Sequence, residues 1–103
     1  FIAQVKALMF DEKQGFATLE QVAQRLHMSE RTLKRQLAKY EATYSDLVEE
    51  SRKQKALDLL ADPSQSLEDI SEYLGYSDMA NFTRAFKRWT EQTPSAYRKS
   101  LAK

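Results

Sequence analysis

Apolar residues recur every three or four positions along almost the whole chain, which is the spacing of helices with one buried side. The segment around which the chain is organised is 46–61, DLVEESRKQKALDLLA, which contains no glycine and no proline. It predicts one continuous helix about 24 Å long, at a rise of ~1.5 Å per residue. We expect its apolar side chains to gather on one side of that helix: Leu47, Val48, Ala56, Leu59 and Leu60.

Shorter helices are predicted on both sides of this central segment. Capping-box patterns open two of them, at Thr18-x-x-Gln21 and at Ser66-x-x-Asp69. Single caps are predicted at Ser29, Ser77 and Thr93, the last followed by Pro94 at the first helical position. The predicted helices cover about 2–10, 18–26, 30–39, 46–61, 66–74, 78–90 and a last segment from 94. The chain is therefore expected to be all-α, with about seven helices.

The segments that flank the central helix resemble each other. TLEQVAQRLHMS at 18–29 aligns with SLEDISEYLGYS at 66–77, 48 positions later. One extra residue then enters the second copy, and at an offset of 49 Arg35 matches Arg84. Two copies are too few for a solenoid, which needs about three or more. The prediction is a first unit over 1–44, a linker helix over 45–61 and a second unit over 62–103.

Each unit has the layout of a helix-turn-helix, in which two helices meet at a steep angle across a short turn. A small residue is needed where the helices cross, and Ala23 and Ser71 occupy that position. The turn favours a residue that tolerates a positive φ, which Gly75 does and His27 does less commonly. The aromatic stripe of 78–90 is expected to be core, and Tyr97 is expected to pack against it.

The outer faces of the second helices carry side chains that suit a DNA major groove. Arginine donates two hydrogen bonds to guanine, asparagine pairs with adenine, and methionine or alanine contacts a thymine methyl group. Lysine can reach phosphates instead, as Lys34 or Lys39 would. The candidate DNA-binding residues are Arg31, Thr32, Lys34, Arg35, Lys39, Met79, Ala80, Asn81, Thr83, Arg84 and Lys87.

The net charge of the chain, +1, is small for a protein that binds nucleic acid, but its distribution is uneven. Residues 25–39 carry five Lys or Arg against one Glu, and residues 78–103 carry six against two acids. The rest holds five basic and twelve acidic residues. This pattern indicates two basic patches on a mildly acidic body, although charges that only solvate helix faces would give the same counts.

Composition argues against other classes of protein. There is no cysteine, a single histidine, no glycine-rich phosphate loop and no metal-ligand spacing, so neither an enzyme nor a cofactor site is expected. No apolar run approaches 18 residues, so we expect no membrane segment and a cytoplasmic location. A chain that begins at Phe1 suggests a fragment of a longer protein.

The segment DISEYLGYSDMANFTRAFKRWTEQTPSAYRKS, at 69–100, resembles the signature of the AraC/XylS family of bacterial transcription regulators. The resemblance covers about residues 3–99, and Arg52, Ala56, Leu59 and Leu60 fit that family's central helix. It implies a DNA-binding domain whose two recognition helices enter adjacent major grooves of double-stranded promoter or operator DNA. Ser71 departs from the alanine usual in the family.

The resemblance also implies partners for the protein and a weaker direct readout of bases by its second unit. RNA polymerase is an expected partner, activation the expected outcome, and an effector-binding or dimerisation domain the expected neighbour in a longer chain. Met79 and Ala80 are weak base readers, so the second unit is expected to rely on backbone contacts and Arg84. The alternative is an all-α protein-interaction module without DNA binding, in which Arg35 and Arg84 are charges at the rim of a protein interface.

Overall fold

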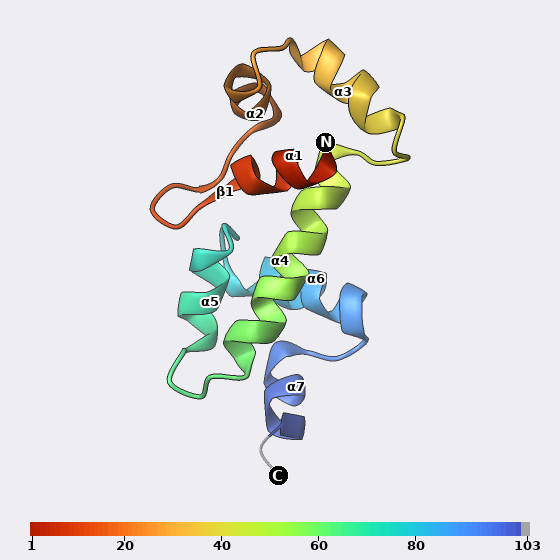
Figure 1. The fold of residues 1–103 in the computed structure, drawn as a ribbon. Helices are drawn as coiled ribbons and strands as arrows, with labels where there is room; N and C mark the ends of the chain where they lie inside the picture. Colours follow the sequence, from red (N-terminus) through yellow and green to blue (C-terminus); the bar gives the residue numbers. More distant parts are fainter. Residues whose placement is uncertain (102–103) are drawn as a thin grey trace. The chain divides into compact units, whose positions relative to one another are not determined.

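The computed structural model describes residues 1–101, and regular structure there consists of seven helices and one pair of short strands (Figure 1). The predicted all-α class with seven helices is confirmed. The elements are α1 Ile2–Met9, β1 Phe10–Asp11, β2 Gly15–Phe16, α2 Leu19–Arg25, α3 Glu30–Ala38, α4 Tyr44–Leu60, α5 Leu67–Tyr73, α6 Met79–Thr90 and α7 Pro94–Leu101. Lys103, counted in the second basic stretch, lies outside the described residues.

The chain forms two compact units, with the division between Glu50 and Ser51 inside α4. Each unit has its own cluster of buried apolar side chains.

The core of the first unit is built by one or two side chains from each of its helices. Its buried members are Val5 and Met9 of α1, Val22 and Ala23 of α2, Leu33 and Leu37 of α3, and Leu47 of α4. The predicted capping box at the start of α2 is confirmed, because the Thr18 hydroxyl accepts from Gln21 N at 3.1 Å and Gln21 Oε1 accepts from Thr18 N at 2.9 Å. These contacts fix where α2 begins.

A small antiparallel pair of strands joins α1 to α2, and sequence analysis did not predict it. Phe10 pairs with Phe16, and their rings meet edge to face with centroids 4.9 Å apart. Asp11 Oδ1 accepts from Lys13 N at 2.7 Å, and Gly15 has φ of 81°. The predicted first helix ran to residue 10, but it ends at Met9 because the side-chain turn at Asp11 and the glycine favour a hairpin over another helical turn.

The core of the second unit is more aromatic. Its buried members are Ala56 and Leu60 of α4, Ile70 and Leu74, and Phe82 and Phe86 of α6. Trp89 and Tyr97 pack against this cluster, and the ring centroids of Phe86 and Tyr97 are 5.5 Å apart. The predictions of an aromatic core stripe and of an inward Tyr97 are therefore confirmed.

Two predicted caps in the second unit were partly wrong. The Ser66 hydroxyl accepts from Asp69 N at 3.0 Å, but the structure has no return bond to the Asp69 carboxylate, whose side chain is one methylene shorter than that of Gln21. Helix α6 is capped by Asp78 rather than Ser77, because the Asp78 carboxylate accepts from Asn81 N at 2.7 Å. The extra residue of the second copy is thus the cap itself.

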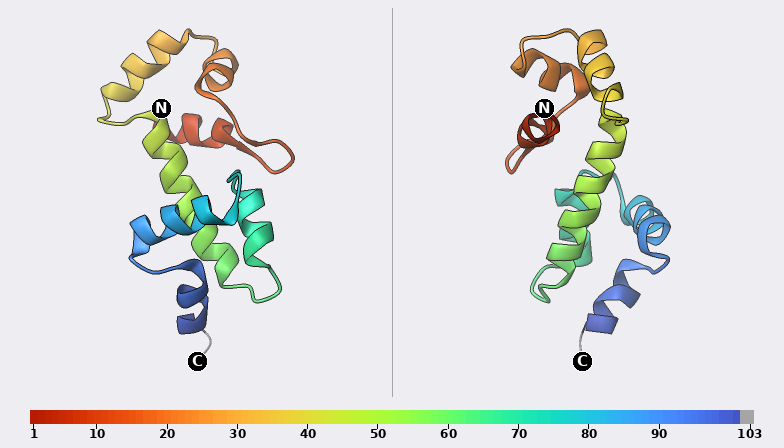
Figure 2. Two further views of the ribbon diagram at one scale, coloured as in Figure 1. Left: turned by 180° about the vertical axis from the view of Figure 1, so that it is seen from behind. Right: turned by 45° about the vertical axis from the view of Figure 1, so that its right-hand side comes forward.

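The predicted central helix exists, and it begins two residues earlier than predicted (Figure 2). The Thr43 hydroxyl accepts from Asp46 N at 3.1 Å at its start. The prediction that its apolar residues share one side was wrong, because Leu47 and Ala56 are both buried although nine residues of α-helix place them on opposite sides of the helix axis. Leu47 and Val48 belong to the first cluster, whereas Ala56, Leu59 and Leu60 belong to the second, so the two ends of α4 serve different cores.

Arg98 of α7 satisfies carbonyl groups at the C-terminal end of α4. Its Nε donates to Leu60 O at 3.2 Å and its Nη2 donates to Asp62 O at 3.2 Å. A helix end leaves such carbonyls without partners in the helix, so Arg98 acts as their cap. Next to it, hydrogen bonds from the hydroxyl and the backbone N–H of Ser64 hold the pKa of Asp62 below its usual range.

We expect Arg98→Ala to lower the free energy of unfolding by about 1–2 kcal/mol, because two charge-assisted hydrogen bonds to backbone carbonyls are lost. Lys99→Ala is the matched control, because its neighbouring side chain is exposed and a surface change of this kind costs less than about 0.5 kcal/mol. Urea denaturation of both variants measures the difference. Equal stability of the two would contradict the capping role.

Candidate nucleic-acid interface

Both units contain two helices that meet at a steep angle across a short turn, α2 with α3 and α5 with α6 (Figures 1 and 2). In the first turn Met28 N donates to Ala23 O at 3.0 Å, and in the second Tyr76 N donates to Ser71 O at 3.1 Å. His27 and Gly75, each just before the donor, have φ of 57° and 91°. The expected positive φ is therefore present at both positions.

The residues at the helix crossings are small and buried, as sequence analysis predicted. Ala23 is 2% exposed and Ser71 is 3% exposed. Ser71 differs from an alanine in one respect, because its hydroxyl donates to Asp78 O at 3.3 Å. It thereby links α5 to the residue that caps α6.

Arg52 of α4 fixes the second turn from the other side. Its Nε donates to Leu74 O at 3.0 Å, and its guanidinium carbon lies 5.1 Å from the centroid of the Tyr76 ring. A Cβ atom built on Gly75 would lie 3.4 Å from Arg52 Nη2. Sequence analysis placed Arg52 in the central helix but missed this role, because nothing in the local pattern links it to a turn 22 residues later.

Helix α3 presents its predicted residues to solvent. Arg31, Lys34, Arg35 and the following Lys39 are exposed, and Thr32 is half-buried. Leu33 and Leu37 of the same helix are in the core. Within the described residues no hydrogen bond or ion pair engages the side chain of Arg35, which leaves its guanidinium donors available.

The predicted residues of α6 differ more in their exposure to solvent. Ala80, Arg84 and Lys87 are exposed, whereas Asn81 and Thr83 are half-buried. Met79 packs against the second core, so only part of its side chain faces solvent. The exposed side of α6 therefore centres on Arg84.

A chain of side-chain hydrogen bonds runs along the exposed side of α6. Asn81 Nδ2 donates to Ser77 Oγ at 2.8 Å, and Arg84 Nη2 donates to Asn81 Oδ1. Sequence analysis treated Asn81 and Arg84 as independent base readers. The structure instead joins them, which the spacing of three residues on one helix could have indicated.

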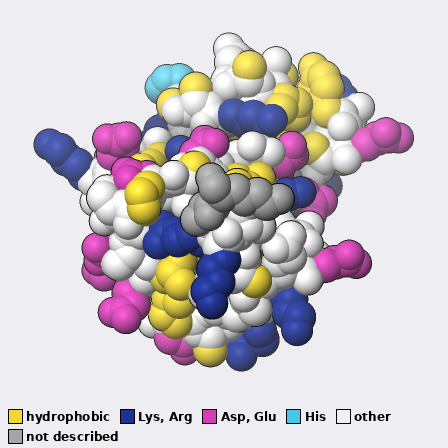
Figure 3. Space-filling view, turned by 90° about the horizontal axis from the view of Figure 1, so that it is seen from below, with side chains coloured by type: hydrophobic (Ala, Val, Ile, Leu, Met, Phe, Trp, Pro, Cys, Tyr) yellow, Lys and Arg dark blue, Asp and Glu magenta, His cyan; other side chains and the backbone are white. Residues whose placement is uncertain are grey.

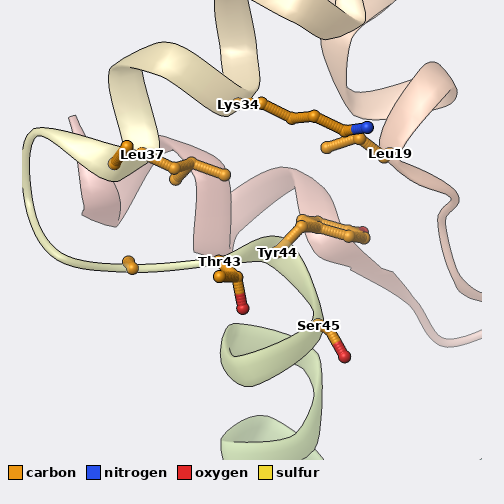
Figure 4. A pocket seen from close by; sticks show the side chains of 8 residues that line it. Leu19, Lys34, Leu37, Thr43, Tyr44 and Ser45 are labelled. Carbon is orange, nitrogen blue, oxygen red and sulfur yellow. The ribbon is translucent and has the colours of Figure 1, made fainter.

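Lys34 borders a largely apolar pocket of about 480 Å³ in the first unit (Figure 4). Its aliphatic stem extends toward Leu19, over a floor that includes Leu37 and Tyr44. Tyr44 is itself fixed by a hydrogen bond from its hydroxyl to Ala17 O. Lys34 thus lies on the flank of α3 that faces α2 and the start of α4.

Charged side chains of both signs share the surface of the molecule. On the face that Figure 3 shows, Lys and Arg side chains (dark blue) lie interspersed with Asp and Glu side chains (magenta). One basic residue of the second stretch, Arg98, is half-buried and bound to carbonyls. The number of basic residues is therefore larger than the number of basic side chains that are available to contact a ligand. The exposed arginines of α3 and α6 define the candidate site better.

The part of the chain that the structure describes contains no helix long and apolar enough to cross a membrane. Among the same residues, no three His, Asp or Glu side chains lie together in a way that could hold a metal ion.

Comparison with known proteins gives a consistent result. A family model described as "Helix-turn-helix domain" matches residues 22–100. The ornithine utilization regulator of Pseudomonas aeruginosa is 37% identical over 99 residues, which are 96% of this chain and 29% of that protein. The transcriptional regulator VqsM of the same organism is 41% identical over 86 residues, which are 84% of this chain and 26% of that protein. The chain therefore spans less than a third of these relatives' length.

A solved structure shares the fold closely. It is a DNA-binding transcriptional dual regulator from Escherichia coli K-12, with a TM-score of 0.89 and 29% sequence identity. The match covers 96% of this chain and 89% of that one. The fold of both helix-turn-helix units is thus that of a known regulator.

The two turns allow a reciprocal test. We expect Gly75→Ala to destabilise the chain by about 1–2 kcal/mol, because an L-residue is disfavoured at a left-handed φ. His27→Gly removes that cost in the first turn, and we expect stability to rise by up to about 1 kcal/mol. Chemical denaturation measures both. A loss of stability in His27→Gly would show that contacts of the imidazole outweigh its backbone strain.

Proposed function

Because the chain belongs to the AraC/XylS family and is a helix-turn-helix DNA-binding domain of that family, we propose that α3 and α6 are its two recognition helices, seated in adjacent major grooves of one stretch of double-stranded DNA. One observation carries the proposal most directly. The repeat sets an exposed arginine at the same position of both helices, Arg35 and Arg84. The E. coli neighbour, named as DNA-binding, supports the same function.

The exposed side chains have separate roles in this proposal. Arg31, Arg35 and Arg84 read base edges, because a guanidinium donates two parallel hydrogen bonds to the O6 and N7 atoms of guanine. Lys39 and Lys87 neutralise phosphates, which strengthens binding to every sequence alike. Lys34 contacts a phosphate from the flank of α3, where its stem covers the apolar pocket. Ala80 and Thr83 make the smaller contacts of α6 with the groove.

Helix α4 acts as the spacer between the two readers. Its 17 residues form one helix, about 26 Å long at ~1.5 Å per residue. Successive major-groove faces on one side of B-form DNA lie ~34 Å apart. A continuous helix that contributes to both cores limits the separations that the two readers adopt, so one protomer binds one long site.

The wider function extends this proposal to the whole regulator. The curated relatives are more than three times as long as the matched segment, which supports an effector-binding or dimerisation domain elsewhere in the protein. We propose that the regulator is cytoplasmic, has no catalytic activity, and activates transcription through contact with RNA polymerase. An in vitro transcription assay with the full-length protein and a promoter that carries the selected site tests the last point.

The test of DNA binding starts with selection of bound duplexes from a random pool. We expect a preferred site with two half-sites about one helical turn apart. Affinity for that site falls steeply as salt rises, because counterions are released from phosphates. Binding that is absent at low salt would instead favour a protein-interaction module.

Arginine substitutions then assign the readers. We expect Arg35→Ala and Arg84→Ala each to lower affinity for the preferred site by about 1–3 kcal/mol and to relax preference at particular base pairs, one in each half-site. Lys39→Ala is the contrasting variant, expected to weaken binding to all sequences alike. Fluorescence anisotropy with single-base-pair variants of the site measures this. An unchanged base preference in both arginine variants would overturn the assignment of recognition helices.

The spacer is tested by an insertion of four glycines between Glu50 and Ser51, where the two units divide. We expect the native site to lose at least tenfold in affinity, because the readers no longer have a fixed separation. Duplexes with the half-sites one or two base pairs further apart should then bind as well as the native spacing. If the insertion variant keeps the wild-type preference for one spacing, α4 does not set the separation.

A further inference from the structure

We propose that Asn81 is a positioning residue for Arg84: its carboxamide holds the guanidinium in place, and Arg84 alone of the pair reads a base. This inference rests on the proposed function, because it concerns how α6 reads DNA. It replaces the simpler expectation that Asn81 pairs with an adenine.

Both ends of the Asn81 carboxamide are engaged. Nδ2 donates to Ser77 Oγ at 2.8 Å, and Oδ1 accepts from Arg84 Nη2. Recognition of adenine needs the amide donor and the carbonyl acceptor turned together toward one base edge. The carboxamide keeps one N–H and one lone pair, but Ser77 and Arg84 at its opposite ends fix its orientation. Pairing with adenine would require both remaining groups to face the base edge in that orientation, or the carboxamide to turn and lose these contacts.

The backbone of Asn81, from which this network starts, is itself held by hydrogen bonds. Asn81 N donates to the Asp78 carboxylate at 2.7 Å, in the first turn of α6. The carbonyl of Asp78 accepts in turn from the buried Ser71 hydroxyl. Asn81 therefore projects from the first turn of α6, which these hydrogen bonds tie to α5.

Arg84 keeps its capacity to read a base. A guanidinium has five N–H donors, and one of them is used on Asn81. Four remain, and two suffice for guanine. A side chain already ordered by a neighbour loses less conformational entropy on binding than a free one, which raises affinity without a new contact to DNA.

Among the described residues of the first unit, no such hydrogen bond holds the matching arginine, so this unit supplies the control. At the offset of 49, Thr32 stands where the second unit has Asn81. Its hydroxyl accepts from Ser29 Oγ at 2.9 Å, and the Arg35 side chain has no hydrogen-bond or ion-pair partner among the described residues. Thr32→Ala therefore removes a side chain at the matched position without releasing an arginine.

The experiment uses the full chain and a set of duplexes that carry every single-base-pair change of the selected site. The variants are Asn81→Ala, Asn81→Asp, Arg84→Ala, Thr32→Ala and the double variant Asn81→Ala/Arg84→Ala. A thermal melt of each confirms that it is folded. For each variant, the readout is the ratio of affinities at each base pair, so a uniform change in affinity does not count.

We expect Asn81→Ala to lose about 3–10-fold of discrimination at the same base pair that Arg84→Ala affects, since only the ordering of Arg84 is lost. The double variant should discriminate no worse than Arg84→Ala alone. Asn81→Asp should keep discrimination at that base pair, because a carboxylate still accepts from Arg84 although it cannot donate to adenine N7. Thr32→Ala should leave discrimination at that base pair unchanged, because Thr32 lies in the other unit and any base pair that it affects belongs to the other half-site.

Other results would overturn the inference. If Asn81→Ala and Asn81→Asp both change preference at a different base pair, and add to the effect of Arg84→Ala, Asn81 is itself a reader. If Asn81→Ala leaves every ratio unchanged, the carboxamide does not position Arg84. If the wild-type chain shows no preferred sequence, the proposed function fails, and that outcome is seen before any variant is measured.

Discussion

The direction of α3 and of α6, the proposed recognition helices, depends on the turn before each of them, and a backbone hydrogen bond to the preceding helix closes that turn. Its donor follows a residue in the left-handed conformation, and its acceptor is the carbonyl of the small residue at the helix crossing. The bond forms only if two conditions on the residues of the turn and of the helix crossing are met. The turn residue must tolerate a positive φ, and the crossing residue must be small enough to bring the helices close. Ala23 and Ser71 meet the second condition in the two units.

The two turns meet the first condition by different means. Glycine at 75 adopts φ of 91° without a steric penalty, and Arg52 contacts both its neighbours, through Leu74 O and the Tyr76 ring. Histidine at 27 adopts φ of 57° at some cost. The second turn thus combines glycine with contacts from Arg52, whereas the first uses a histidine, whose backbone is less free to adopt a positive φ. The repeat preserves geometry rather than residue identity.

Much of this could be predicted from sequence because it depends on local spacing. The positions of the caps, the 48-residue offset and the apolar period identify the helices, the turns and the exposed arginines. Predictions failed where two residues compete for one role, or where the contact joins residues that lie far apart in the sequence. Asp78 displaced Ser77 as the cap of α6 because both are good caps and only the register of the helix decides. The use of Arg98 on the α4 carbonyls, 36 and 38 residues away, has no local signal. The apolar residues of α4 were assigned to one side because a linear pattern does not reveal that two cores share one helix.

The hydrogen bond between Asn81 and Arg84 has a consequence for how new binding preferences evolve. Under the proposed role of Arg84, a substitution at position 84 alone leaves the carbonyl oxygen of Asn81 without its donor, on the side of α6 that faces the groove. A change of base preference in the second unit then takes two steps, one at each position. Among relatives, these two positions should therefore covary, while the matched pair in the first unit, at 32 and 35, should drift independently.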